Sequence, residues 1–463
     1  MPPRSAGVSC PGNERRDADL GPGAATVLSG WGRWPVMPGH ERLSEDLAAV
    51  TCGATLTRGL GRSYGDASLP AAPGAPVAGS RLADRVIGFD QETGVLHAEA
   101  GLTLRDINRT LLGRGWFVPV TPGTAFVTLG GAVASDVHGK NHHSAGTFGS
   151  HVRGLRLRAG TGAIVEASPG IEPELFDATV GGMGLTGHIL DVEVVLRRVP
   201  SMWIVGETEY VPDLESLLST MLDADRIWPY TLAWMDGLGA GGRGRGVVYR
   251  GRWADADEAR GRELAWPREI AFPAALPYWA LSRFGMRWFN EGVLLSYGRR
   301  VKRGLIHPQR FFYPLDSLLE WNKAYGRRGF TQYQCVLPHK AGLAVYRKVF
   351  RTIDAQGGAP YVVVIKDFGA EGRGRLSFPC PGVTFSIDMP IADGKTQRVV
   401  DAVNDIVAAE GGRVYLSKDA FTRAEHYRAM DSRIDGFNAI RRRWDPHGHI
   451  RSALSVRLLG DVA

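Results

Sequence analysis

Six glycines stand among three histidines and a lysine between Thr121 and Gly149, in TPGTAFVTLGGAVASDVHGKNHHSAGTFG. Glycine lets the backbone adopt positive φ and approach a ligand closely, and the amides freed in this way can point at anionic or carbonyl oxygens. The imidazoles and the lysine add hydrogen-bonding groups and positive charge. A loop that only turned would need fewer such residues, so the segment predicts the wall of a site for a large, polar, phosphorylated cofactor.

Two further glycine clusters lie beside predicted strands. TRGLGRSYGD covers Thr57–Asp66, and GGMGLTGHI covers Gly181–Ile189. The first lacks both the lysine of a GxxxxGK[ST] phosphate loop and the spacing of GxGxxG. Each cluster alone is most simply a tight turn. Three of them in one domain indicate a shared ligand more strongly than any one does.

Some polar side chains admit two interpretations. A lysine after a strand, such as Lys418 in YLSKDAF, is usually a surface charge. Gln332 and Gln334 share one face of a predicted strand, which either meets solvent or lines a pocket. The paired His142 and His143 suggest a metal, but no carboxylate or cysteine stands at ligand spacing, so no metal site is expected.

The length of the chain limits the number of domains, and its net charge limits the classes of ligand to consider. A chain of 463 residues exceeds one hydrophobic core, so two or three domains are expected. A net charge of +7 favours phosphorylated ligands, anionic membranes or nucleic acid. Without a zinc-type or RNA-binding motif, nucleic acid is the weakest of these, and we expect no nucleic-acid partner. The four cysteines lie far apart and do not look like a disulfide framework.

The elements that must position these residues form an α+β pattern. Residues 1–27 are polar, lack the apolar core of a signal peptide, and are expected to be a disordered tail. From about 45 to 200, short apolar runs alternate with glycine-rich turns, including a helix in LTLRDINRTLLGRG, a hairpin in HVRGLRLRAGTGAIVEASPG and a strand in GHILDVEVVL.

The sequence pattern changes after residue 200. Alternating segments predict antiparallel strands in MWIVGETEYV, RFFYPL, FTQYQCVLP, YVVVIKDFG and VTFSIDMPI. Helices in LAVYRKVFRTIDAQGG and TQRVVDAVNDIVAAEGG should pack on one face of that sheet. The aromatic and arginine-rich segment from Phe272 to Arg303 is open to three interpretations: a membrane-surface amphipath, a mobile lid, or a partly buried loop and helix.

The three glycine clusters resemble the FAD-binding domain of the vanillyl-alcohol-oxidase/p-cresol-methylhydroxylase (VAO/PCMH) superfamily, where loops hold FAD. Together with ELFDATVGGMGLTG, FFYPLD, GFTQYQCVLP, LSFPCPG and the late SKD, they are similar to the decaprenylphosphoryl-β-D-ribose 2-oxidase family from about Leu28 to Leu459. The resemblance implies a two-domain VAO/PCMH-type flavoprotein. Its FAD-binding PCMH-type domain would cover 28–200, its substrate-binding domain with an antiparallel sheet 201–411, and a segment returning to the FAD domain 412–463.

The resemblance also implies site residues, carried over motif by motif. The residues implied for FAD are Arg58, Gly59, Leu60, Gly61, Arg62, Ser63, Tyr64, Gly65, Gly123, Thr124, Gly130, Gly131, Ser135, His138, Gly139, Asn141, His143, Ser144, Gly184, Gly187, Ile189 and Tyr415. Those implied for the substrate are Lys140, Trp234, Gln332, Gln334, Lys366 and Ser386. The implied catalytic residues are Lys418, Tyr64 and Gln334.

Two positions depart from related sequences. Many superfamily members attach FAD covalently through a loop histidine, and Arg62 stands at that place, so non-covalent FAD is expected. Ser386 stands where mycobacterial members carry a cysteine near the flavin. The serine removes the thiol that directed inhibitors would trap, but it leaves the oxidation chemistry intact.

The implied activity is FAD-dependent oxidation of the 2′-hydroxyl of a polyprenylphosphoryl-β-D-ribofuranose to the 2-keto sugar. Lys418, with a pKa lowered by desolvation, is the candidate base. An NAD(P)H-dependent reductase partner would complete epimerisation to the arabinose donor for cell-wall arabinan. We expect the protein to be cytoplasmic or peripheral to the cell membrane, with the periplasmic side left open.

Three alternatives stand beside this expectation. The first is an FAD-dependent oxidase or dehydrogenase of a soluble sugar, alditol or aldonolactone. The second is a non-catalytic FAD-bound subunit that docks a reductase. The third is a nucleic-acid binder, which would be colourless and retained on DNA in a strongly salt-dependent way.

Overall fold

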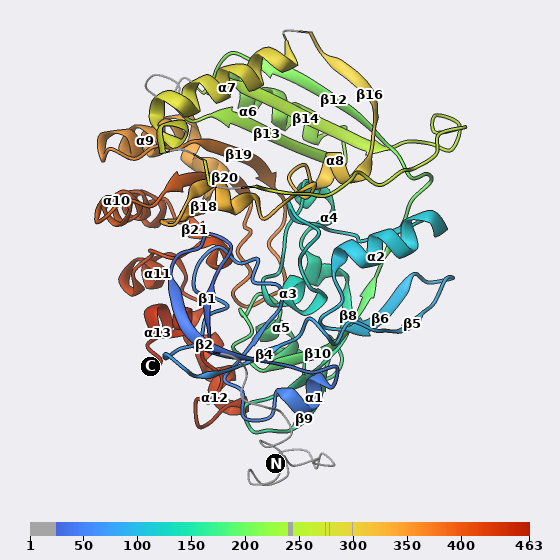
Figure 1. Ribbon diagram of the computed structural model, residues 1–463, viewed down its shortest axis with the longest axis vertical. Coiled ribbons are helices and arrows are strands. Elements are labelled where there is room, and N and C mark those ends of the chain that lie inside the picture. The colour runs from blue at the N-terminus through green and yellow to red at the C-terminus, as the bar shows by residue number, and fades with distance from the viewer. Residues whose placement is uncertain (1–24, 239–243, 274, 277, 299) are drawn as a thin grey trace.

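The computed structural model describes residues 25–238, 244–273, 275–276, 278–298 and 300–463. Most of the predicted tail, residues 1–24, lies outside this range. The last part of that tail is not irregular, because β1 (Ala25–Ser29) pairs antiparallel with β2 (Val36–Leu43). In Figure 1 the blue and green first part of the chain forms the lower half, and a large sheet with its helices forms the upper half.

The first part of the chain builds two sheets. The four-stranded sheet has the order β1-β2-β4-β3, with β3 at Leu56–Arg58 and β4 at Pro76–Gly79. The five-stranded antiparallel sheet has the order β5-β6-β10-β8-β9, with strands at Val86–Phe89, Val95–Glu99, His188–Val195, Val152–Arg158 and Ile164–Ala167. Short helices lie between the strands: α1 (Leu47–Val50), α2 (Leu104–Leu111), α3 (Leu129–Ala134), α4 (His142–Ala145) and α5 (Pro173–Thr179).

Two elements predicted in this part are confirmed. Helix α2 begins after Thr103, whose side chain accepts a hydrogen bond from the Asp106 amide, and it buries Leu104, Ile107 and Leu111. An N-cap of this kind satisfies an amide that the helix cannot pair itself. Strands β8 and β9 form the predicted hairpin, with pairing from Leu155–Ala167 to Arg158–Ile164.

Within the described residues, the second part builds an eight-stranded sheet of order β16-β12-β14-β13-β19-β20-β18-β21. These strands are Lys302–Ile306, Ile204–Val211, Gly246–Trp253, Tyr230–Asp236, Val362–Phe368, Gly382–Pro390, Phe330–Pro338 and Arg413–Val414. Helices α6 (Leu214–Asp225), α9 (Gly342–Ala355) and α10 (Lys395–Ala409) pack against one face through a shared apolar cluster. The predicted α+β class with an antiparallel second sheet is confirmed.

One predicted strand is wrong. The segment RFFYPL does not join the sheet, because helix α8 (Pro308–Phe312) ends within it. His307 caps this helix by accepting a hydrogen bond from the Gln309 amide, and Pro308 occupies the first helical position. Proline there costs no hydrogen bond and presets the helical φ, so the cap outweighs the β-propensity of the aromatic residues.

The end of the chain returns to the first part. Helices α11 (Ala424–Met430), α12 (Ile434–Trp444) and α13 (Ala453–Leu459) follow β21 and run down the side of the molecule in Figure 1. The Arg457 guanidinium on α13 donates to both oxygens of Asp66 at 2.7 Å and to Asp419 at 2.7 Å. This ion cluster fastens the end of the TRGLGRSYGD loop to the segment that carries Lys418.

Cysteine pairing departs from the expectation. Cys52 is disulfide-bonded, a bond that the wide cysteine spacing did not indicate. Cys335 and Cys380 are free and buried. No helix among the described residues is both long and apolar enough to cross a membrane.

Candidate active site

A cavity of about 350 Å³ lies where the glycine-rich loops of the first part face the large sheet. Volumes of this order are usual for small-molecule and cofactor sites. Its lining comes from the first part of the chain, from the eight-stranded sheet and from the segment that carries Lys418. The residues expected at the site that do line it are Gly59, Leu60, Gly61, Arg62, Ser63, Tyr64, Gly123, Thr124, Gly130, Gly131, Ser135, His138, Gly139, Lys140, Gly184, Gly187, Ile189, Gln332, Lys366, Ser386, Tyr415 and Lys418.

Two of the lining glycines keep the cavity open. A Cβ built on Gly123 or Gly184 would meet no atom within 4 Å. Gly184 also has a φ of +75°, which L side chains rarely adopt. A side chain at either position would project into the space that a ligand needs. The glycines of this wall therefore form a cradle that side chains would fill.

In the part of the chain that the structure describes, His138 has an unpartnered ring nitrogen in the wall of the same cavity. The Gln334 amide nitrogen donates to Thr384 Oγ1 and to His138 Nε2, both at 3.0 Å. His138 Nε2 is therefore an acceptor, which places the ring proton on Nδ1. Nδ1 is buried and has no hydrogen-bond partner among the described residues. Burial lowers the pKa of His138 well below its usual value, aided by the charge of Lys366, so the ring is neutral.

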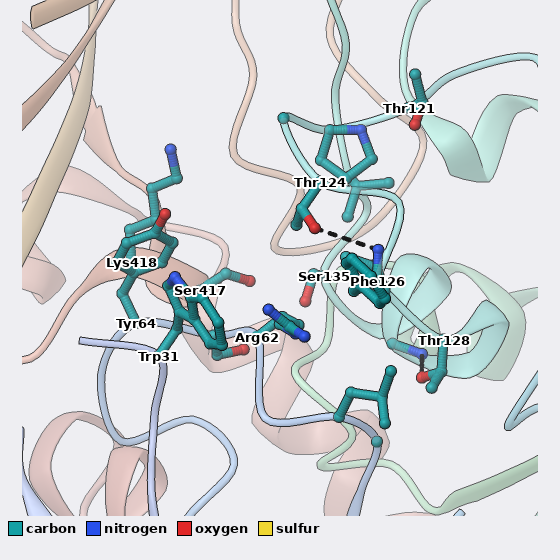
Figure 2. A pocket seen from close by; sticks show the side chains of 18 of the residues that line it. Trp31, Arg62, Tyr64, Thr121, Thr124, Phe126, Thr128, Ser135, Ser417 and Lys418 are labelled. Atoms are coloured by element: carbon teal, nitrogen blue, oxygen red, sulfur yellow. Dashed lines mark hydrogen bonds between the residues drawn. The ribbon is translucent and has the colours of Figure 1, made fainter. Parts of the chain in front are cut away.

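Arg62 occupies a slot between two aromatic rings at the cavity wall. Its guanidinium carbon lies 3.9 Å from the centre of the Trp31 ring and 4.8 Å from that of Phe126. Figure 2 shows Arg62 between these two rings, with Tyr64 and Lys418 beside Trp31. Stacking of this kind fixes the plane of the guanidinium and orders the TRGLGRSYGD loop.

The polar end of the cavity centres on Lys418. The Lys418 ammonium donates to Ser386 Oγ at 2.9 Å and lies 5.7 Å from the centre of the Tyr64 ring. A hydrogen bond of 2.7 Å from the Tyr64 amide to the Ser417 carbonyl joins the two loops. Burial and, to a smaller extent, the charge of Lys366 lower the pKa of Lys418 to about 7, against an opposing effect of Asp388. Lys418 can therefore exchange a proton near neutral pH.

Asp388 completes this end. Ser386 and Asp388 stand two apart on β20 and share one face, and Gln332 on the paired β18 donates to Asp388 at 2.5 Å. Burial raises the pKa of Asp388 to about 6, while the hydrogen bond from Gln332 and the charge of Lys418 act in the other direction. The site thus holds a buried lysine and a buried carboxylate whose ionisation is mutually dependent.

Two further lysines give the cavity a cationic region. Burial lowers the pKa of Lys140 to about 7, with a contribution from Lys366, and burial lowers that of Lys366 to about 8. The Lys140 ammonium donates to the Phe312 carbonyl at 3.1 Å and faces the Phe311 and Phe312 rings. An anionic group that binds beside these two lysines would favour their charged forms, so they can supply positive charge to it.

Comparison of the chain with known proteins shows the family to which it belongs. An FAD binding domain matches residues 47–168. The decaprenylphosphoryl-β-D-ribose oxidase of Mycolicibacterium smegmatis is 33% identical over 455 residues, which cover 93% of this chain and 97% of that protein. The chain belongs to the decaprenylphosphoryl-β-D-ribose oxidase family. It is an FAD-dependent oxidoreductase.

Two other relatives match different shares of the chain. A protein of Streptomyces coelicolor, named only as an uncharacterized protein in the mprA 5′ region, is 34% identical over 77% of this chain and 100% of its own length. Mouse L-gulonolactone oxidase is 29% identical, but over only 30% of each chain. Similarity to sugar-lactone oxidases is thus partial, whereas similarity to the decaprenylphosphoryl-ribose oxidase runs through both sheets.

The residues of the cavity fit FAD. A dinucleotide needs a long groove with close backbone approach and donors for its phosphates and ring edges. The open wall at Gly123 and Gly184 gives that approach, and His138 in the same wall has a buried ring nitrogen without a partner among the described residues. The glycine-rich loops form one side of the cavity, and Lys418, Ser386 and Asp388 form another.

Some residues expected to contact FAD lie behind the wall instead. Arg58 donates to Ser29 and Ser68 and so joins neighbouring segments of the first sheet. Gly65 packs against the Asp419 carbonyl, where a side chain would collide. For these two, a direct contact with the cofactor is corrected to support of the TRGLGRSYGD loop.

The end of HGKNHH also turns away from the cavity. The Asn141 amide donates to the Pro119 carbonyl at 2.9 Å, His143 Nε2 bonds the Trp228 carbonyl at 3.0 Å, and Ser144 donates to the Asn141 carbonyl. His143 and Ser144 thus face the loop before β13, and Asn141 bonds the segment that follows β7 (Trp116–Phe117). Their expected contact with FAD is therefore corrected to a structural role.

Two residues of the large sheet are corrected in the same way. Gln334 is buried behind His138, so it positions the imidazole and does not line the cavity. Trp234 pairs with the cavity residue Val364, but its own side chain is not part of the lining, which β13 reaches through Leu232, two residues earlier on the same strand.

Several lining residues were not predicted from the sequence, and two carboxylates are the most important of them. Asp388 carried a signal, because it stands two residues after Ser386 on a predicted strand. Asp316, the last residue of FFYPLD, accepts a hydrogen bond from the Ala125 amide at 2.7 Å, and burial raises its pKa to about 6. Trp31 and Phe126 gave no signal, since only the fold brings them to Arg62.

Proposed function

We propose that this protein oxidises the 2′-hydroxyl of a polyprenylphosphoryl-β-D-ribofuranose to the 2-keto sugar. The observation that carries the proposal is the cavity itself. One end holds a lysine that can lose its charge near neutral pH, and Lys140 and Lys366 lie close enough to supply positive charge for a phosphate. The relative over nearly the full length is named for a substrate with these two features, a sugar hydroxyl and a phosphodiester.

The chain's own residues handle the proton of the reaction. Oxidation of a secondary alcohol removes a hydride from carbon and a proton from oxygen, leaving a C=O double bond. FAD, when bound, supplies the acceptor for the hydride. Neutral Lys418 Nζ accepts the hydroxyl proton, and Ser386 Oγ, at 2.9 Å, holds that nitrogen in place. Tyr64, whose pKa is raised by burial, stays protonated and can donate a hydrogen bond to the sugar or the flavin edge.

The remaining residues bind and orient. Gln332 holds Asp388 and can turn its carbonyl toward the sugar, while Lys140 and Lys366 hold the phosphate. We propose that FAD is held by the glycine loops, His138, Ser135 and Tyr415, and that it is not covalently attached. Arg62 supports this, since a guanidinium cannot form the histidyl bond of covalent relatives, and its place between two rings commits it to stacking.

Anaerobic reduction of the bound flavin tests the substrate. Polyprenylphosphoryl ribose should bleach the flavin absorbance rapidly, and free ribose, alditols and aldonolactones should do so slowly or not at all. Good turnover of a free polyol with weak turnover of the lipid-linked sugar would replace the proposal with a soluble-sugar oxidase. Purified protein that contains no flavin would contradict both the proposed activity and the soluble-sugar oxidase alternative.

The variant Lys418→Met tests the assigned base. We expect flavin reduction to slow by about 10²–10⁴, the usual contribution of a positioned acid or base. The flavin content should stay unchanged, because the glycine loops carry the binding. Sugar-driven bleaching at the native rate would remove Lys418 from the mechanism, and a complete lack of bleaching in the native protein would favour a non-catalytic FAD-bound subunit.

We further propose two partners. A 2-keto sugar becomes the epimer only when a reductase returns a hydride to the other face, so an NAD(P)H-dependent reductase should consume the product and yield the arabinose donor. The substrate carries a polyprenyl chain, so the protein should make peripheral contact with a membrane. Coupled assays with candidate reductases should turn over ribose to arabinose only when both proteins are present.

A further inference from the structure

Helix α7 (Arg283–Tyr297) has an apolar surface on both sides. Its inner side is buried through Met286, Asn290 and Leu294. Ser282 caps its start by accepting a hydrogen bond from the Gly285 amide at 3.1 Å. A helix packed in this way on a soluble domain normally presents charged and polar residues on its outer side.

The outer side of α7 is aromatic and aliphatic instead. The exposed fractions are 71% for Phe284, 67% for Trp288 and 73% for Leu295. At 3.6 residues per turn these three side chains fall within about 40° of the helix circumference, opposite the buried side. We call these three residues the α7 stripe. Phe289, at 56% exposure, lies about 100° further round the helix from Trp288, so it is exposed but is not part of the stripe. Large apolar side chains this exposed, gathered on one helix, mark an interaction surface.

The α7 stripe lies next to the cavity. The Asn290 amide on the inner side donates to Asp236 Oδ1 at 2.7 Å. Asp236 pairs with Val362 across β13 and β19, so the two share a face of the sheet, and Val362 lines the cavity. Helix α7 is therefore on the same face of the large sheet as the proposed substrate site. In Figure 1 it lies at the top of the molecule, and the first part of the chain lies in the lower half.

Positive charge borders the stripe. Arg287 is exposed on α7 itself, and Arg300, Lys302 and Arg303 are exposed just after the helix, the last two on the edge strand β16, where Arg303 also pairs with Glu207 at 3.5 Å. The acidic residue of the helix, Glu291, is neutralised by Arg245 at 2.5 Å. An apolar stripe with tryptophan and a basic border is the pattern of a helix that lies in the plane of an anionic membrane surface.

We propose that the α7 stripe docks the protein on an anionic lipid bilayer. Phe284, Trp288 and Leu295 enter the boundary between headgroups and acyl chains, and the basic border contacts lipid phosphates. The orientation places the face of the sheet that lines the cavity beside the bilayer. The proposal rests on the proposed function only for what this achieves, which is access to a substrate whose prenyl chain is embedded in that bilayer.

Co-sedimentation of the full-length flavoprotein with vesicles tests the surface. Vesicles of phosphatidylcholine alone are compared with vesicles of phosphatidylcholine and phosphatidylglycerol. The test variant is Phe284→Ser/Trp288→Ser/Leu295→Ser, and the matched control is Val86→Ser/Ile171→Ser/Ile227→Ser, which changes three exposed apolar residues on other elements. We expect the native protein and the control to bind anionic vesicles, and the test variant to bind at least roughly tenfold more weakly.

Three results would overturn the proposal. Native protein that stays in solution with anionic vesicles excludes bilayer docking. A test variant that binds as the native protein does moves docking to another surface. A native dimer that the test variant converts to a monomer assigns the stripe to a second copy of this chain. Flavin reduction by substrate dispersed in detergent is measured in parallel. Flavin reduction in detergent does not need a bilayer. A loss of this reduction would therefore count against the proposed function and not against the docking surface.

Discussion

At the residue scale, Lys418 is tuned by two neighbours that act in opposite directions. Its pKa is lowered to about 7, mainly by burial; the charge of Lys366 adds to this effect, and that of Asp388 opposes it. A base must be neutral to accept a proton, and a lysine with a pKa near 7 is neutral in a large fraction of molecules at physiological pH. We therefore expect flavin reduction at saturating substrate to rise with pH through about 7 and then level off.

Substitution of the two neighbours should move that midpoint in opposite directions. Asp388→Asn removes the charge that raises the pKa of Lys418, so the midpoint should shift to lower pH. Lys366→Gln removes a charge that lowers it, so the midpoint should shift to higher pH. The measurement is the rate of anaerobic flavin reduction across pH. Shifts in the same direction for both variants would show that the profile reports another group.

Gly123 should be essential for cofactor space and dispensable for folding. It lines the cavity, a Cβ there would meet nothing within 4 Å, and its φ is not positive. Gly123→Leu should therefore fold but retain much less FAD. Gly113→Leu is the matched control, because its Cβ also meets nothing within 4 Å and it lies away from the cavity. Flavin absorbance per protein measures both, and equal retention would place FAD elsewhere.

At the scale of elements, Arg457 on α13 clasps two segments of the site. Asp66 and Asp419 are each 4% exposed, and both bind its guanidinium. Removal of one partner leaves buried charges without compensation, which usually costs about 3–5 kcal/mol. Arg457→Ala should lower the free energy of unfolding by an amount of that order and lower FAD retention, since the loops of Tyr64 and Lys418 meet there.

A charge-matched variant separates charge from packing. Arg457→Ala combined with Asp66→Asn and Asp419→Asn removes the guanidinium and both charges together, so it should recover part of the lost stability in a denaturant titration. Arg443→Ala is the control, because its ion pair with Glu174 is half exposed on both sides. Exposed pairs contribute about 0–1 kcal/mol. Equal losses for Arg443→Ala and Arg457→Ala would contradict the clasp.

The elements also show where sequence reasoning succeeds and fails. The β8–β9 hairpin and α2 were predictable because period, turn and cap residues agreed locally. RFFYPL was not, because a proline and a histidine cap outside the motif decide its helix. For the site, the glycine loops were recognisable as a set. Motifs could not tell that Gln334 supports His138 while Gln332 reaches the cavity, since both stand on one strand face.

At the scale of the whole molecule, the cavity belongs to no single part of the chain. Its wall combines the glycine loops, strands β18, β19 and β20 of the large sheet, and the segment that carries Lys418. A ligand that binds all three stabilises their assembly by RT ln(1 + [L]/Kd), which is about 2.7 kcal/mol at a hundredfold excess over Kd. FAD removal should therefore lower the melting temperature of the whole molecule, and readdition should restore it in a concentration-dependent way.

The form of the transition distinguishes a shared cavity from a cofactor site confined to the first part. Because the first part of the chain and the large sheet both line the cavity, we expect one cooperative unfolding transition by calorimetry. The temperature of this single transition should rise as FAD is added. Riboflavin and ADP serve as controls, since each carries one end of the dinucleotide and cannot bridge the cavity. Each should raise the melting temperature less than FAD does at the same concentration. Two separate transitions, of which only one responds to FAD, would mean that the large sheet folds independently of the cofactor and contributes only substrate contacts.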